Sequence, residues 1–150
     1  VMTASPLQLE RHFFSKVQID AGPANKPGVP NALHCELEIG QAADDPKRFQ
    51  VVLRLKLQPP PDNTASYTGE VHAVGLFKVV NGWPEERIGD LVEANGAAFL
   101  YGCIREMVLN VTSRGPWPAV TLGAVTFVQP KNKHGSSASA SLLPQEAGKS

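Results

Sequence analysis

The chain has 150 residues, a length that suits one domain burying roughly two thirds of the surface that its unfolded form exposes. Its 14 basic and 14 acidic side chains balance, which argues against an electrostatic attraction to nucleic acid or to an anionic membrane. No apolar run approaches the ~20 residues that cross a bilayer, and the N-terminal residues lack the apolar core of a signal peptide. We therefore expect a cytoplasmic protein with no direct membrane insertion.

The first half of the chain alternates between apolar and polar side chains with the period of a half-buried β-strand. This pattern predicts strands at residues 7–20, 32–41, 48–58 and 67–80. The turn-forming residues Asp44, Asp45 and Pro46 lie between the second and third strands and predict a β-hairpin. In the fourth strand, Val74 and Leu76 alternate with Phe77 and Val79, so one end should be covered on both faces.

The period changes after Pro84, where residues 84–96 predict a short helix that ends at Gly96. Residues 97–113 predict a longer helix whose apolar side chains cover about half of its circumference. We expect Gly115 in the left-handed conformation just past this helix, and Pro116 and Pro118 prevent its continuation. The polar residues 128–150 should form a disordered tail, which leaves residues 1–127 as the folded domain.

The sequence offers little chemistry for catalysis. Its four histidines have no metal-ligand spacing, no glycine-rich loop could hold phosphate, and the aromatic residues do not interleave with a basic stripe as in a nucleic-acid platform. Cys35 and Cys103 lie in apolar patterns typical of buried, reduced thiols. We therefore expect no catalytic residue, metal or cofactor, and a thiol enzyme that uses Cys103 is the less favoured alternative.

These elements predict an α+β fold, in which a long helix of the C-terminal half packs across a four-stranded antiparallel sheet. One sheet face and one side of the helix would satisfy such a packing, yet this helix is apolar over a wider arc. The remaining apolar surface must either join subunits or bind apolar segments of other proteins.

Several blocks of the chain between Leu7 and Phe127 resemble the SecB family of export chaperones. They are LQLERHFFSKVQID before a proline-rich loop, DDPKRFQVVLRLKL, GEVHAVGLFKV and, most specifically, FLYGCIREMVLNVTSRGPWPAVTLGAVTF. The resemblance implies a homotetramer built as a dimer of dimers. It also implies ATP-independent holding of unfolded precursor proteins in apolar grooves, before their transfer to the translocation motor SecA.

Three sets of residues are candidates for these roles. A client-binding groove is predicted from Phe13, Phe14, Leu76, Phe77, Trp83, Phe99 and Tyr101, and an oligomer interface from Ile104, Met107, Val108 and Val111. The resemblance implies a motor-docking surface at Asp20 and Glu70, although Lys16 stands where the family has an acid. Two alternatives remain open: a SecB-like chaperone of a toxin–antitoxin system, and an oligomeric adaptor that is not a chaperone.

Overall fold

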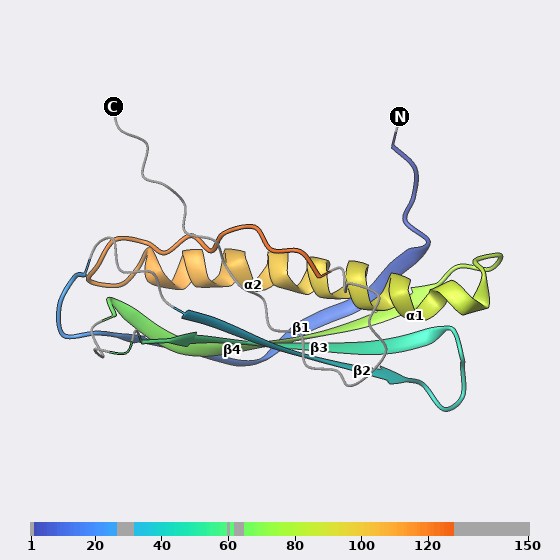
Figure 1. The fold of residues 1–150 in the computed structure, drawn as a ribbon, viewed down its shortest axis with the longest axis horizontal. Coiled ribbons are helices and arrows are strands. Elements are labelled where there is room, and N and C mark those ends of the chain that lie inside the picture. The colour runs from blue at the N-terminus through green and yellow to red at the C-terminus, as the bar shows by residue number, and fades with distance from the viewer. Residues whose placement is uncertain (1, 27–31, 60, 62–64, 128–150) are drawn as a thin grey trace.

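A computed structural model describes residues 2–26, 32–59, 61 and 65–127. The tail predicted for residues 128–150 lies outside the described residues. The described chain forms two layers, with one antiparallel sheet below and one long helix lying across it (Figure 1). This arrangement confirms the predicted sheet and helix.

The strands are β1 (Leu7–Ala21), β2 (Ala32–Gln41), β3 (Arg48–Gln58) and β4 (Tyr67–Val79). They lie in the order β1-β4-β3-β2, so β1 and β2 form the two edges of the sheet. The predicted hairpin is confirmed, because β2 pairs with β3 in antiparallel register. At its turn, the Asp45 carboxylate accepts a hydrogen bond from the backbone N–H of Lys47 (2.9 Å).

The two faces of the sheet differ in polarity. The face toward the helix carries Val51, Leu53 and Leu55 of β3, all fully buried, beside Val71 and Ala73 of β4. The opposite face, which we call the outer face, carries mainly polar side chains. Val52 and Val74 are paired at its centre and are each 7% exposed. The predicted cover on both faces of β4 is therefore seen only in part, since Val74 is buried but Leu76 is partly exposed.

The helical region is continuous from Glu85 to Thr112. It comprises η1 (Glu85–Arg87), α1 (Ile88–Leu91), a π-helical turn η2 (Val92–Gly96) and α2 (Ala97–Thr112). Gly96 was predicted to break the helix, and this was wrong. The glycine is buried and a Cβ there would lie 3.1 Å from Cγ2 of Val51, so it permits close packing of the helix on β3.

The helix ends where predicted, but the role of Gly115 was wrong. Among the described glycines only Gly82 has a positive φ, of 91°. Gly115 instead makes room for the Tyr67 hydroxyl, on which a Cβ would fall. That hydroxyl lies within donating distance of two carbonyl oxygens, those of Trp117 (2.9 Å) and Thr112 (3.2 Å), which compete for its one proton, and it accepts from the Trp117 N–H (3.0 Å). A buried tyrosine thus ties β4 to the end of α2.

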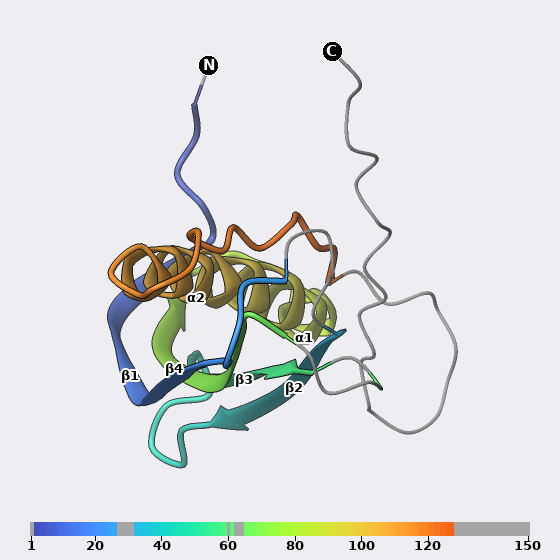
Figure 2. The ribbon, with the colours of Figure 1, turned by 90° about the vertical axis from the view of Figure 1, so that its left-hand side faces the viewer.

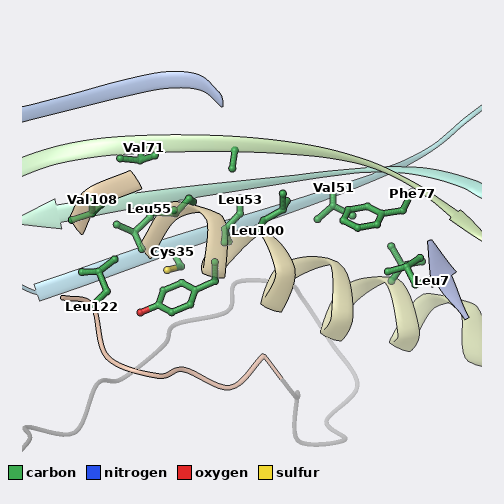
Figure 3. Packing of buried hydrophobic residues seen from close by; sticks show 14 of the residues in the cluster. Leu7, Cys35, Val51, Leu53, Leu55, Val71, Phe77, Leu100, Val108 and Leu122 are labelled. Carbon is green, nitrogen blue, oxygen red and sulfur yellow. The ribbon is translucent and has the colours of Figure 1, made fainter. Parts of the chain in front are cut away.

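Beyond the helix, the chain reverses and runs back along α2 without regular secondary structure as far as Phe127 (Figures 1 and 2). The Trp117 indole N–H anchors the start of this segment by donating to the carbonyl of Gly22 (3.0 Å). Further along, Leu122 lies beside Cys35 of β2 in the core (Figure 3). The segment therefore completes the core on the side of β2.

Candidate functional site

Several large apolar side chains of the described residues are partly exposed to solvent. Six of them, all in regular elements, have between 37% and 42% of their surface exposed: Leu9, Phe13, Val17, Ile39, Phe99 and Leu109. Three of these lie on the edge strand β1 and two on α2. Their number and their placement on a sheet edge and a helix are features of surfaces that bind other chains.

The seven residues predicted to line one groove are divided between the two faces of the sheet. Phe13 pairs with Val74 on the outer face, where Leu76 also lies, whereas Phe14 pairs with Ala73 on the helix-facing side. Phe77 and Tyr101 are 3% and 5% exposed and belong to the core. Trp83 and Phe14 are partly buried against that core. In the single chain these seven residues therefore do not share one face, and their role in binding clients stays a prediction.

Phe99 is the member of the predicted set that is best placed for contact with another chain on the helix side. Its ring stands edge-on to Phe77, with the ring centroids 6.0 Å apart, and to His12 of β1, with the centroids 5.6 Å apart. This aromatic contact fixes an exposed ring above the β1 side of the sheet. A partly exposed ring held by neighbours loses little further conformational entropy on binding.

The residues predicted for an oligomer interface differ in how deeply they are buried in the single chain. Ile104 and Val108 are fully buried beneath the helix and pack in the core of the single chain. Met107 and Val111 are only partly buried, and they keep apolar surface along one flank of the buried side of α2. Of these four residues, only Met107 and Val111 therefore retain surface that a partner could cover.

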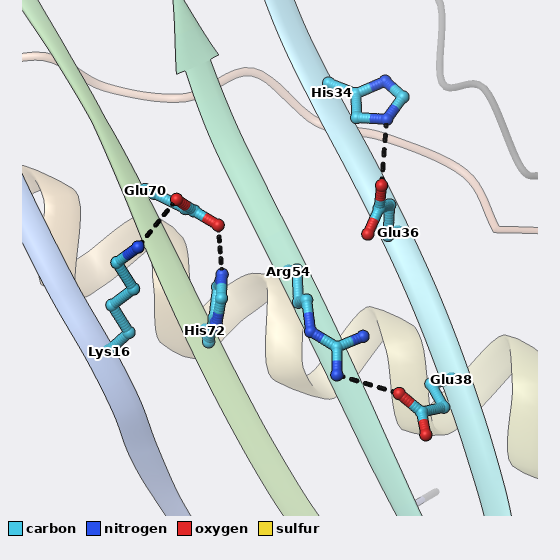
Figure 4. A network of polar contacts seen from close by, with 7 residues as sticks. All are labelled: Lys16, His34, Glu36, Glu38, Arg54, Glu70 and His72. Atoms are coloured by element: carbon cyan, nitrogen blue, oxygen red, sulfur yellow. Dashed lines mark hydrogen bonds and ion pairs between the residues drawn. The ribbon is translucent and has the colours of Figure 1, made fainter.

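The outer face of the sheet carries a network of ion pairs (Figure 4). Lys16 Nζ of β1 donates to one oxygen of Glu70 (2.9 Å), and His72 Nε2 donates to the other (2.5 Å). The hydrogen bonds from Lys16 and His72 lower the pKa of Glu70 from 4.5 to about 2. Glu70 is therefore ionised at neutral pH, but Lys16 balances its charge.

Other charges on this face are paired in the same way. Arg54 Nη2 lies 2.8 Å from Glu38 Oε2, and Arg48 Nε lies 3.1 Å from Glu10 Oε1. Asp20, the second predicted docking residue, accepts a hydrogen bond from the Gln18 amide (3.1 Å). The outer face is therefore mixed in charge, with an apolar centre over which the Arg11 guanidinium lies 5.1 Å from the Phe13 ring centroid.

The cysteines are placed for packing. Cys35 is buried, Cys103 is partly buried, and neither forms a disulfide. Burial raises the pKa of both thiols, and the nearby Glu106 adds to the effect at Cys103. A raised pKa keeps a thiol protonated at neutral pH and disfavours nucleophilic attack. Within the described ranges, no group of three or more His, Cys, Asp or Glu side chains could hold a metal ion.

One feature that the sequence reasoning left without a role is the apolar run after Pro118. Val120, Leu122, Val125 and Phe127 pack against the core, and the Tyr101 hydroxyl donates to the Gly123 carbonyl (2.5 Å). The alternation of apolar and small or polar residues in AVTLGAVTF could have indicated an extended segment with one buried side.

Comparison with known proteins places this fold in a family. Residues 16–133 match the family model described as SecB, preprotein translocase subunit SecB. Proteins named protein-export protein SecB are similar in sequence. That of Psychrobacter arcticus is 28% identical over 130 residues, covering 82% of this chain and 84% of the relative. That of Nitrosococcus oceani is 31% identical over 78 residues, covering 52% of this chain and 47% of the relative.

A solved structure has the same fold. The SecB-like chaperone of Mycobacterium tuberculosis, in complex with a ChAD peptide from an antitoxin, matches with a TM-score of 0.63 and 22% identity. The match covers 83% of this chain and 92% of that one. None of the described helices is long and apolar enough to span a membrane. Because the family model matches well over half of its residues, the chain belongs to the SecB family of protein-export chaperones.

Proposed function

We propose that the chain is an ATP-independent holdase of the cytoplasm, which binds unfolded precursor polypeptides and keeps them competent for export. The observation that carries the proposal is the partly exposed apolar surface on β1 and α2, in a chain of the SecB family. Burial of such surface contributes roughly 25 cal/mol for each Å² removed from water. Recognition should therefore follow the exposed apolar length of a client and not a short motif.

The working form that we propose is a homotetramer, built as a dimer of dimers. Among the described strands, the edge strand β1 pairs only with β4, so its other edge is free. Two side chains of β1, Leu9 and Val17, are partly exposed. A long, partly apolar edge is commonly protected by pairing with another strand. Met107 and Val111 leave partly exposed apolar surface along one flank of α2, which a second dimer would cover.

Aggregation of a slowly folding precursor tests the holding activity directly. Without nucleotide, the full chain should suppress light scattering at near-stoichiometric amounts, and Phe99→Ser should require severalfold more protein. Ala98→Ser, at the neighbouring exposed position, is the matched control. If the wild-type chain leaves aggregation unchanged at an excess over the precursor, the chain is not a holdase but an oligomeric adaptor.

Cys103→Ser separates this proposal from thiol chemistry. Because burial raises the pKa of the Cys103 thiol, we expect the variant to suppress aggregation as well as the wild type does. Loss of activity in a variant with an unchanged circular dichroism spectrum and oligomeric mass would instead favour a thiol enzyme.

SecA is the proposed recipient of clients, with docking at Asp20 and Glu70 on the outer face. Because Lys16 balances the charge of Glu70, we propose that this docking is weaker than an unopposed acidic surface would allow. Asp20→Asn should reduce SecA binding and leave client binding unchanged. If SecA binding is the same in this variant and in the wild type, the docking surface lies elsewhere.

A second candidate function is protection of an antitoxin. It is favoured by the structural match to a SecB-like chaperone bound to an antitoxin peptide, and by the pairing of the acidic docking residue Glu70. The two functions differ in the client and in the need for SecA. Competition between an export precursor and an antitoxin ChAD peptide for the purified chain would distinguish them.

A further inference from the structure

The outer face of the sheet is hollowed at the end near the turn between β2 and β3. We call this feature the hairpin-end hollow; it has a volume of about 540 Å³, and its lining includes Glu10, Gly40, Arg48, Gln50 and Leu76. Gly40, Gln50 and Leu76 lie in one row across β2, β3 and β4 in the register of the sheet. A volume of this size lies within the range of about 300–1,000 Å³ that is usual for ligand sites.

Gly40 keeps the hollow open toward the β2 edge of the sheet. A Cβ at this position would meet no heavy atom within 4 Å, whereas Glu38 and Ala42, on the same face of β2, both carry side chains. The backbone does not require glycine here, because among the described glycines only Gly82 has a positive φ. Glycine inside a strand often marks the close approach of another molecule. The missing side chain therefore leaves space that a side chain of a partner can fill.

The charges around the hairpin-end hollow are mainly positive. Arg48 lies 3.1 Å from Glu10 and 3.8 Å from Asp45, so its own charge is balanced. Lys78 lies opposite Arg48 in the register of β3 and β4, and Arg11 follows Glu10 on β1. Within the part of the chain that the structure describes, neither Lys78 nor Arg11 forms an ion pair. The rim of the hollow thus offers two cationic groups to a partner.

The surface between these charges is apolar. Leu76 is partly exposed in the hollow, and Phe13, 38% exposed, continues the apolar surface on β1 beside Val74. The exposed Gln50 side chain forms no hydrogen bond with the other described residues, so its amide can both donate to and accept from a peptide group. An apolar floor, a peptide-like amide and a basic rim are complementary to a polypeptide that carries a bulky apolar side chain next to acidic ones.

We propose that the hairpin-end hollow docks a short acidic segment of a partner protein. A bulky apolar side chain of that segment fills the space beside Gly40 and rests on Leu76, while its carboxylates meet Lys78 and Arg11. The apolar contact supplies affinity through burial, and the charges select an acidic partner over a neutral or basic one.

This site lies at the other end of the outer face from the proposed docking surface for SecA. Asp20 of that surface pairs with Thr68 of β4, which is eight residues from Leu76, or roughly 26 Å along a strand. The two ends of the outer face therefore suit partners of opposite charge. The inference does not depend on the holding of unfolded clients.

The test measures binding of the full chain to a fluorescent peptide, GSGFDEEGS, by fluorescence anisotropy at low salt. Gly40→Leu fills the hollow without a clash, and it should lower the affinity at least about tenfold, because the phenylalanine ring can no longer be buried. The variant should unfold at the same or a higher denaturant concentration, since glycine weakens a strand. His34→Leu adds an apolar side chain to the same face of β2 outside the hollow, and it should leave the affinity unchanged.

Charge variants test the basic rim. Lys78→Gln and Arg11→Gln should each lower the affinity roughly threefold to tenfold at low salt, and the differences from the wild type should disappear at high salt. Lys56→Gln is the matched control, because Lys56 is an exposed lysine of the outer face that does not line the hollow. A peptide with serine in place of phenylalanine should bind at least about tenfold more weakly.

The outcomes decide between this inference and two others. If Gly40→Leu binds the peptide as tightly as the wild type does, or if the serine peptide binds equally well, the peptide meets only surface charge and the proposal is overturned. If an unfolded precursor displaces the peptide, the hollow belongs to the client-binding surface and the proposal of a separate acidic partner is overturned. Gly40→Leu should suppress precursor aggregation as the wild type does, so failure of the holding function would be seen independently.

Discussion

The ion pair between Lys16 and Glu70 joins the edge strand β1 to its neighbour β4. Because the pKa of Glu70 is lowered to about 2 in the folded chain, ionised Glu70 stabilises the fold above pH 4.5, its ordinary value. That stabilisation is lost as the pH falls from 4.5 through about 2. Both side chains are partly exposed, so salt should weaken the effect.

Lys16→Gln should raise the pKa of Glu70 and lower the free energy of unfolding at neutral pH. The difference from the wild type should shrink as the pH falls from 4.5 through about 2, because Glu70 becomes protonated in both proteins over this range. Side-chain NMR titration and denaturant unfolding at several pH values measure the two effects. Lys56→Gln is the control, because Lys56 lies opposite Glu70 in the register of β3 and β4 but is not among the groups that lower the pKa of Glu70. Equal pKa values for Glu70 in the wild type and Lys16→Gln would contradict the assignment.

Gly102 within α2 and Gly115 just beyond its end should respond in opposite ways to substitution by alanine. Gly115→Ala would place a Cβ on the Tyr67 hydroxyl, and it should destabilise the chain by about 1–3 kcal/mol through strain or the loss of the tyrosine's hydrogen bonds. Gly102→Ala, in open space on α2, should stabilise it by about 0.5–1 kcal/mol. Denaturant midpoints at equal slopes would measure both, and destabilisation by Gly102→Ala would show that its position is not open.

At the level of elements, alternation and turn residues were sufficient to predict the sheet. The bounds of β2 and β3 were predicted to the residue, and those of β1 and β4 to within one residue, because turns flank a clear period of two. This period already placed Leu76 and Phe77 on different faces of the sheet, and it could have separated Phe13 from Phe14 in the same way. Treating these neighbours as one groove ignored the alternation.

The orientation of α2 could not be predicted in this way. Its apolar arc includes Phe99, Cys103 and Met107 as well as Leu100 and Ile104, and either side could pack on a sheet. Only the tertiary contacts show that Leu100 and Ile104 face the core. The role of Gly96 was missed for a similar reason, since its closeness to Val51 is a long-range contact.

Adjacent positions on α2 separate folding from assembly. Val108→Asp places an unpaired charge in the core and should unfold the single chain, at a cost of several kcal/mol. Met107→Asp, at a partly exposed position, should leave the circular dichroism spectrum unchanged and reduce the oligomeric mass measured by light scattering. A folded Met107→Asp variant with the wild-type mass would show that this side of α2 is not an interface.

For the whole molecule, the balance of charge predicts different salt responses for the two proposed partners. Client holding by apolar burial should change little with ionic strength, because it does not depend on net charge. Docking of SecA on the outer face should depend on the few acidic groups available there. On that face the positive charge of Lys16 offsets the negative charge of Glu70. Replacing Lys16 by an acidic residue should therefore favour a basic partner.

Lys16→Glu should therefore tighten SecA binding, roughly threefold to tenfold at low salt, and leave the affinity for unfolded clients unchanged. The gain should disappear at high salt, because the added charge is exposed and becomes screened. Arg105→Glu makes the same change of charge at an exposed position of α2, away from the outer face, and serves as the control. Binding of SecA and of a precursor, measured by titration across salt concentrations, gives both affinities. If Lys16→Glu and Arg105→Glu tighten SecA binding equally, the response reflects net charge, and Asp20 and Glu70 do not form a docking surface.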